Sequence, residues 1–305
     1  MQLFDLHCDT LYECYTKGYH LSRNPGQVDL VRAGSLETWV QGFALWIPDR
    51  LRGEAAWDLC RRLLSVARRE EEQAEGEIRF LRKGERLDEL LPSYPRIGFL
   101  AVEGGAAVGD DLSRIRELAA FGVKYITITW NGSNEWGNGC LSPDTGGLTP
   151  FGKEGVRRCR EAGILPDVSH LNEASFWDLA ETAEGPILAT HSNAAALVPH
   201  PRNLTDPQFE EIRRRGGLVG LNLAAALLGE QTLEAAERHL CHFWERGGED
   251  TVCLGCDLDG TPVPARWNGM AIIGALWAYL IRKNYDTELL RKLFFGNCYN
   301  FFKSL

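Results

Sequence analysis

The stretch "LFDLHCD" (residues 3–9) places a histidine and an aspartate, His7 and Asp9, at the end of an apolar run. The run has the apolar character of a buried strand. Successive side chains of a strand point to opposite faces, so positions 7 and 9 are expected on the same face. Burying even a neutral polar group without a partner costs on the order of 2–7 kcal/mol. A metal ion is one partner that could compensate both groups together.

Seven further strand-like runs follow, and most are separated by segments with helical spacing. The eight runs are residues 3–9, 39–47, 96–104, 123–130, 164–170, 186–192, 217–223 and 252–260. The helical segments between them are residues 54–75, 110–122, 149–163, 172–184, 205–217 and 230–248, and two more helices are expected after the last run.

This alternation over 305 residues predicts an α/β fold, a (β/α)8 TIM barrel, with residues 1–305 as a single catalytic domain. The alternative is a doubly wound open sheet. That fold should show a glycine-rich phosphate-binding turn after the first strand, and "HCDTLY" (residues 7–12) contains no glycine.

Charge, cysteine content and hydropathy limit the kinds of partner and location that we expect for this protein. The formal net charge of −9 without a basic stripe argues against a nucleic-acid partner. Nine cysteines without a framework spacing predict reduced thiols and a cytoplasmic location. The pair Cys253 and Cys256 lacks a second pair that would complete a zinc site. The start of the chain shows no leader, and the apolar segment 270–281 is too short to span a bilayer, so no membrane partner is expected.

Residues of metal-binding type end five of the eight runs. In a TIM barrel the active site lies at the C-terminal ends of the strands, so these residues should meet at one rim. They are His7 and Asp9, Glu103, His170, His191, and the pair Asp257 and Asp259. Taken singly, each has a structural explanation, such as Asp9 capping the next helix. Their coincidence at one rim favours a shared site. The remaining histidines, His20, His200, His239 and His242, lack this placement.

Three imidazoles and two carboxylates form a ligand set that suits zinc, with manganese or iron as alternatives. One catalytic zinc usually has three protein ligands, so this set predicts two ions about 3.5–4 Å apart. His7 and Asp9 would hold one ion and His170 and His191 the other, with Glu103 as the bridge.

Six motifs in order resemble the membrane (renal-type) dipeptidase family of the amidohydrolase superfamily. They are "DLHCDT", "VEGG", "DVSH", "THSN", "PRN" and "GCDLDG", spread over essentially the whole chain. The resemblance implies a barrel peptidase with two zinc ions bridged by Glu103 and the same ligands. It also implies that Arg202 grips the substrate carboxylate and that Asp257 is the catalytic acid and base. Relatives of this type suggest a homodimer.

The stretch after the fourth run departs from the family pattern. Many members carry a histidine that polarises the scissile carbonyl, and Trp130 stands at that place. An indole donates one hydrogen bond and carries no charge. We expect Trp130 and Asn131 to bind substrate. The family's end signature is also changed, since "FGNCYNFF" (residues 295–302) retains only Gly296 and Asn297.

The sequence therefore predicts a metal-dependent dipeptidase that hydrolyses small dipeptides through a metal-bridging hydroxide. The main alternative is another amidohydrolase, a deacetylase or deaminase acting on a small carboxylate-bearing substrate, because one barrel supports many reactions. A binding protein that has lost turnover through Trp130 is a third reading. The fourth is a haloacid-dehalogenase-type phosphatase, because "DLDGT" (residues 257–261) matches its opening motif, although little chain follows it.

Overall fold

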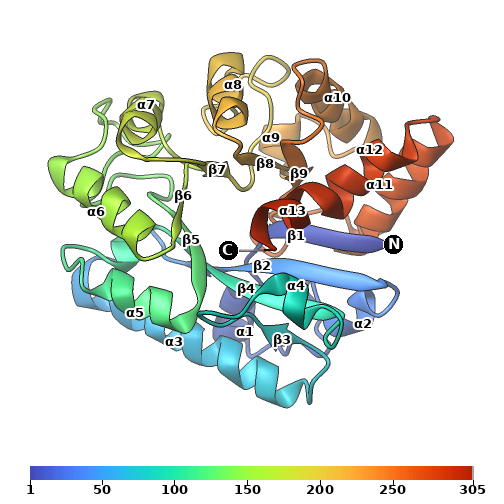
Figure 1. Ribbon diagram of the computed structural model, residues 1–305, viewed down its shortest axis with the longest axis horizontal. Coiled ribbons are helices and arrows are strands. Elements are labelled where there is room, and N and C mark those ends of the chain that lie inside the picture. Colours follow the sequence, from blue (N-terminus) through green and yellow to red (C-terminus); the bar gives the residue numbers. More distant parts are fainter. Residues whose placement is uncertain (304–305) are drawn as a thin grey trace.

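Parallel strands form a closed ring surrounded by helices in the computed structural model, which describes residues 1–303 (Figure 1). The eight strands of the ring are β1 (Gln2–Cys8), β2 (Thr38–Trp46), β4 (Arg96–Glu103), β5 (Val123–Thr127), β6 (Leu165–Asp167), β7 (Leu188–Ala189), β8 (Leu218–Leu221) and β9 (Val252–Leu254). β1 pairs with both β2 and β9, and β2 also pairs with β4, which closes the ring. The predicted (β/α)8 barrel is confirmed, and the open-sheet alternative is wrong.

Helices cover the outside of the ring. They are α1 (Thr10–Lys17), α2 (Leu30–Ala33), α3 (Gly53–Gln73), α4 (Leu87–Leu90), α5 (Arg114–Phe121), α6 (Pro150–Glu161), α7 (Glu173–Thr182), α8 (Asp206–Arg214), α9 (Ala225–Leu228), α10 (Leu233–Trp244), α11 (Ala271–Arg282), α12 (Thr287–Arg291) and α13 (Asn297–Phe302). Each predicted helical segment overlaps one of them, and three helices rather than the predicted two follow the last run. The sequence missed α1, α2, α4, α9 and the two-residue strand β3 (Arg79–Phe80), which pairs with β4 outside the ring. Apart from α1, which has the same eight-residue length as the predicted α5, these elements span only two to four residues and are too short to show a clear periodic pattern.

Side-chain caps start several of the covering helices. Thr149 accepts a hydrogen bond from Gly152 N at the start of α6, and Asn172 accepts one from Ser175 N at the start of α7. Such a cap satisfies a backbone donor that would otherwise lack a partner. The caps therefore determine where each helix leaves the loop that carries site residues.

The barrel interior is apolar and is closed at its N-terminal end by α13. The Phe302 ring lies 5.7 Å from Phe4 of β1 and 5.3 Å from Phe99 of β4, measured between ring centroids. Figure 1 shows α13 lying across the ring. The polar residues of the barrel gather at the opposite end.

A β-bulge in β1 turns His7 toward the barrel interior. The register pairs Asp5 with Gln41 and Cys8 with Phe43. β1 thus has one more residue than β2 between these pairs. Leu6 belongs to the interior core, so the next residue of a regular strand would face outward. The bulge, rather than regular alternation, directs His7 inward.

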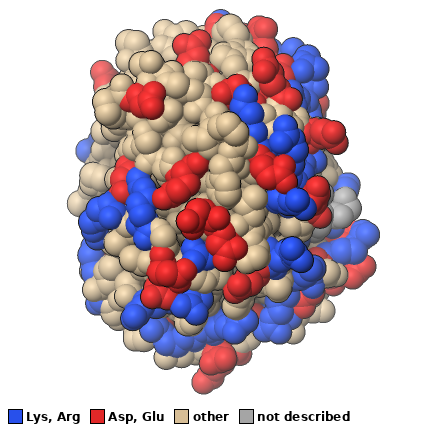
Figure 2. Space-filling model, turned by 90° about the vertical axis from the view of Figure 1, so that its left-hand side faces the viewer, with Lys and Arg blue, Asp and Glu red and all other residues tan. Residues whose placement is uncertain are grey.

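Charged side chains are interspersed on the face shown in Figure 2, which carries α6. Arg158 of α6 pairs there with Glu154 and Glu161. Exposed pairs of this kind contribute about 0–1 kcal/mol each. Within residues 1–303, no helix combines the length and apolar character needed to cross a bilayer.

Gly255 allows two strand ends to approach one another beside the predicted site. A Cβ on Gly255 would lie 1.7 Å from the carbonyl oxygen of Thr190. We therefore expect Gly255→Ala to lower the free energy of unfolding by about 1–3 kcal/mol, as overpacked core substitutions do. Gly274 in α11 is the matched control, because a Cβ there meets no atom within 4 Å. Gly274→Ala should instead raise stability by about 0.5–1 kcal/mol. Urea unfolding measures both changes, and equal stability of the two variants would contradict the expectation.

Candidate active site

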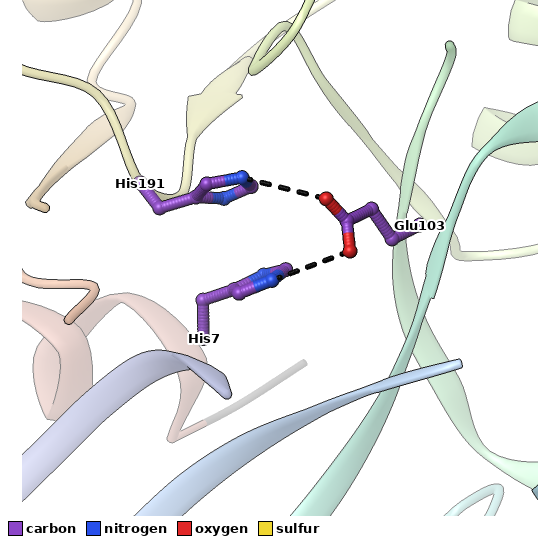
Figure 3. Close-up of side chains that lie close together, drawn as sticks. All are labelled: His7, Glu103 and His191. Atoms are coloured by element: carbon purple, nitrogen blue, oxygen red, sulfur yellow. Dashed lines mark ion pairs between the residues drawn. The ribbon is translucent and has the colours of Figure 1, made fainter. Parts of the chain in front are cut away.

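Side chains from several strand ends converge on Glu103, the last residue of β4. Glu103 Oε2 lies 3.5 Å from His7 Nε2. Glu103 Oε1 lies 3.0 Å from His170 Nε2 and 3.6 Å from His191 Nε2. Asp9 Oδ2 is 3.5 Å from the same nitrogen of His7. Figure 3 shows Glu103 facing the stacked rings of His7 and His191. The structure thus brings together all of the predicted metal ligands, and all are buried.

The cluster has the character of a cation site. Both ring nitrogens of His7 and Oδ1 of Asp9 are buried without a hydrogen-bond partner among residues 1–303. Leaving such groups unsatisfied costs about 1–3 kcal/mol each. Two overlapping groups of three residues hold ligand atoms within 4.8 Å of one another, namely His7, Glu103 and His191, and His7, Asp9 and Asp257. Nitrogen and carboxylate donors gathered in this way fit a zinc-type ion.

Protonation favours metal ligation at His170, His191 and Glu103. Burial lowers the pKa of His170 to about 3. Burial also holds the pKa of His191 well below its usual value. Both rings are then neutral at pH 7, which is the form that binds metals. Burial would raise the pKa of Glu103, but the charge of the nearby His7 outweighs it and holds this pKa well below its usual value.

Asn131 orients one of the imidazoles. Its Oδ1 lies 2.9 Å from His170 Nδ1. A ring whose Nδ1 donates to an amide oxygen presents Nε2 to a metal. His170 also has a left-handed backbone, with φ 75°, which is uncommon for a residue with a side chain. Asn131 was predicted to bind substrate; it lines the cavity, but its hydrogen bond shows that it also supports a ligand.

Asp257 follows β9 and faces the same centre. Its Oδ2 accepts a hydrogen bond of 3.0 Å from Asn222 Nδ2. Burial raises the pKa of Asp257, so this carboxyl group takes up a proton more readily than an exposed aspartate does. Asn222 was not predicted as a site residue, although it is a polar amide near the end of the apolar run 217–223. Asp259 points elsewhere, because its carboxylate accepts hydrogen bonds from Thr10 Oγ1 and Gln27 N, both at 2.7 Å.

A cavity of about 430 Å³ opens over these residues. Its volume falls in the range of small-molecule sites, about 300–1,000 Å³. Trp130 lies in its wall and packs edge-to-face on Trp46, with 5.0 Å between ring centroids. Tyr12 continues this wall at 4.6 Å from Trp46. A larger groove, of about 590 Å³, lies outside the barrel beside Phe121 and includes none of the metal-binding residues.

Arg202 lines the cavity and is 7% exposed. Its guanidinium donates to Ser192 Oγ at 3.3 Å and to the carbonyl oxygen of His191 at 3.1 Å. Among the residues that the structure describes, no carboxylate forms an ion pair with it. A buried charge without a counter-ion is costly, so the site is suited to an anionic group of a ligand.

The other histidines lie outside the cluster around Glu103. His200 accepts a hydrogen bond from Arg202 N at 3.1 Å and lines the cavity. His20 lies near Glu70, His239 accepts from Ala194 N, and His242 contacts Asp206. His200 is thus the one of these four that the structure adds to the cavity wall.

Comparison with known protein families agrees with this geometry. A family model described as membrane dipeptidase (peptidase family M19) matches residues 1–305. The chain belongs to this family.

Solved structures related to this membrane dipeptidase chain share its whole fold. A crystal structure of a metallo peptidase from Rhodobacter sphaeroides, liganded with a phosphinate mimic of the dipeptide L-Ala-D-Ala, is 29% identical with a TM-score of 0.91, covering 100% of this chain and 99% of that one. The dipeptidase AC, a metallo peptidase of family M19, is 30% identical with the same TM-score and the same coverage. A protein encoded in the pqqA 5′ region of Klebsiella pneumoniae is 38% identical over 209 residues, 64% of this chain and 77% of that protein.

Two stretches of the sequence also suggested other functions, namely residues 257–261 and the pair Cys253 and Cys256. The "DLDGT" stretch lies after β9, the last strand of a membrane dipeptidase barrel, so the phosphatase reading is wrong. Cys253 and Cys256 are buried free thiols. A metal is implied by the metallopeptidase family, and the cluster around Glu103 is the candidate site for it.

Proposed function

We propose that this protein is a binuclear zinc dipeptidase that hydrolyses the peptide bond of small dipeptides. The observation that carries this proposal is the shared cavity, which joins the ligand cluster around Glu103 to the unpaired guanidinium of Arg202. The Rhodobacter sphaeroides metallo peptidase with its dipeptide mimic supports the same substrate class.

His7 and Asp9 would hold one zinc ion and His170 and His191 the other. The two oxygens of Glu103 face different imidazoles, so this residue is suited to bridge the ions. When bound, the pair of ions supplies an activated water at neutral pH and polarises the scissile carbonyl.

Asp257 would move the proton. Its carboxylate accepts a proton from the attacking water and passes it to the leaving amine, as general base and then acid. The hydrogen bond from Asn222 holds one carboxylate oxygen in place. Arg202 would grip the C-terminal carboxylate of the dipeptide with its planar fork, which aligns the peptide bond with Asp257.

Arg202→Ala should mainly weaken binding of substrates with a free carboxylate. We expect KM for dipeptides to rise about tenfold to a hundredfold, because hydrogen bonds to charged groups contribute about 1.5–3 kcal/mol. C-terminally amidated dipeptides serve as the matched substrates, since they lack the charge. Steady-state kinetics on both substrate sets measures the effect. An equal rise in KM for both sets would argue against the clamp.

A substrate panel on zinc-loaded protein tests the proposed function itself. Release of free amino acids from dipeptides is expected, with little release of acetate from N-acetyl amino acids or of ammonia from amidine-type substrates. Preference for the acetylated compounds would indicate a deacetylase, and preference for the amidines a deaminase. Binding of dipeptides without turnover would indicate the binding-protein reading.

A further inference from the structure

We propose that Asp167 and Thr190 are positioning residues that hold His191 in the tautomer needed for metal binding. This role rests on the proposed metal-dependent function. Asp167 ends β6 beneath the ligand cluster and is 0% exposed. The reaction steps above give this buried carboxylate no role.

Four donors converge on the carboxylate of Asp167. The backbone N–H groups of Ser169 and Thr190 each lie 3.0 Å from Oδ1. The hydroxyls of Thr127 and Thr190 lie 2.7 Å and 2.6 Å from Oδ2. Four donors on two oxygens is the pattern of a carboxylate anion, which only accepts hydrogen bonds. Asp167 therefore ties together the ends of β5, β6 and β7.

The direction of these hydrogen bonds assigns the tautomer of His191. Thr190 has one hydroxyl proton, and Asp167 Oδ2 accepts it. The Thr190 oxygen must then accept from its other close neighbour, His191 Nδ1, at 2.8 Å. With Nδ1 protonated, the lone pair of the neutral ring is on Nε2. That nitrogen lies 2.9 Å from His170 Nε2 and 3.6 Å from Glu103 Oε1, inside the ligand cluster.

Asp167 also controls the backbone of His191 through Ser169. Ser169 N donates to Asp167, and Ser169 Oγ accepts from His191 N at 3.2 Å. Both the ring and the main chain of His191 are thus held from one carboxylate. Partners of this kind fix ring orientation and raise the basicity of histidine ligands.

The test is the zinc affinity of the full-length chain, measured by competition with a chromogenic chelator. Thr190→Val removes the acceptor of His191 Nδ1 and should weaken zinc binding about 10–100-fold, as loss of such a partner does. Thr127→Val is the matched control, because it removes a donor from the same oxygen of Asp167 without touching His191. It should retain wild-type affinity, and Thr190→Ser, which keeps the hydroxyl, should do so as well.

A second readout uses the metal-free protein and does not depend on activity. In ¹⁵N NMR of histidine-labelled wild type, His191 should be the neutral tautomer with the proton on Nδ1. Asp167→Asn should move that proton to Nε2, because an amide can donate to Thr190 and free its hydroxyl to donate to the ring. Wild-type zinc affinity in Thr190→Val, or an equal loss in Thr127→Val, would overturn this role. Wild-type turnover is measured separately, so failure of the proposed function would be seen as absent hydrolysis by zinc-loaded wild type.

Discussion

Asp257→Asn is expected to slow dipeptide hydrolysis about 10²–10⁴-fold, the usual contribution of general acid–base catalysis, while both metal ions stay bound. An amide cannot take the proton from the attacking water. The fold should tolerate the change, because Asn222 already donates to Oδ2, which becomes an amide oxygen of the same shape. Measurement of kcat together with zinc content of the purified variant tests both parts of this expectation.

Asp259→Asn is the matched control in the same motif. Asp259 is two residues further along, but its carboxylate is engaged with Thr10 and Gln27 rather than with the ligand cluster. We expect near wild-type kcat for this variant. Full turnover in Asp257→Asn would show that the proton moves by another route.

His170→Ala is expected to abolish hydrolysis together with the binding of one of the two metal ions. The ring supplies one of the nitrogens beside Glu103 Oε1, and its loss leaves His191 as the other imidazole of that half of the centre. The zinc content should fall from about two ions per chain to about one. Because a bound metal stabilises the folded state, zinc should also raise the melting temperature of the variant less than that of wild type.

His20→Ala provides the control for a histidine outside the centre. The side chain of His20 is 53% exposed and lies near Glu70. Zinc content and hydrolysis should match those of wild type. Two zinc ions in the His170→Ala variant would exclude His170 as a ligand, whatever the loss in rate.

Metal loss in His170→Ala and metal retention in Asp257→Asn together separate two ways of losing activity. The first variant loses one of the two ions, and the second loses the proton acceptor. A general disturbance of the barrel would instead reduce zinc content and stability in both variants.

The eight strands could be predicted because each is an apolar segment bounded by turns and followed by a helical pattern. All eight appear in the barrel, but several are shorter than predicted. Residues 186–192 contain β7 as Leu188–Ala189 only. The residues after such a short strand leave the backbone ladder and supply site side chains such as Thr190 and His191. The cytoplasmic location, the homodimer and the absence of a nucleic-acid partner stay predictions from the sequence.

The sequence by itself determined the architecture and the types of ligand, because strand–helix alternation sends every strand end to one rim. This alternation predicts that His7, Glu103 and His191 lie at one mouth of the barrel. Only the tertiary structure decided which atoms meet there. The bulge that turns His7 inward and the contact of Thr190 with Asp167 depend on register and packing between strands. These contacts join residues that are far apart in the chain, so they cannot be inferred from the local periodicity of the sequence.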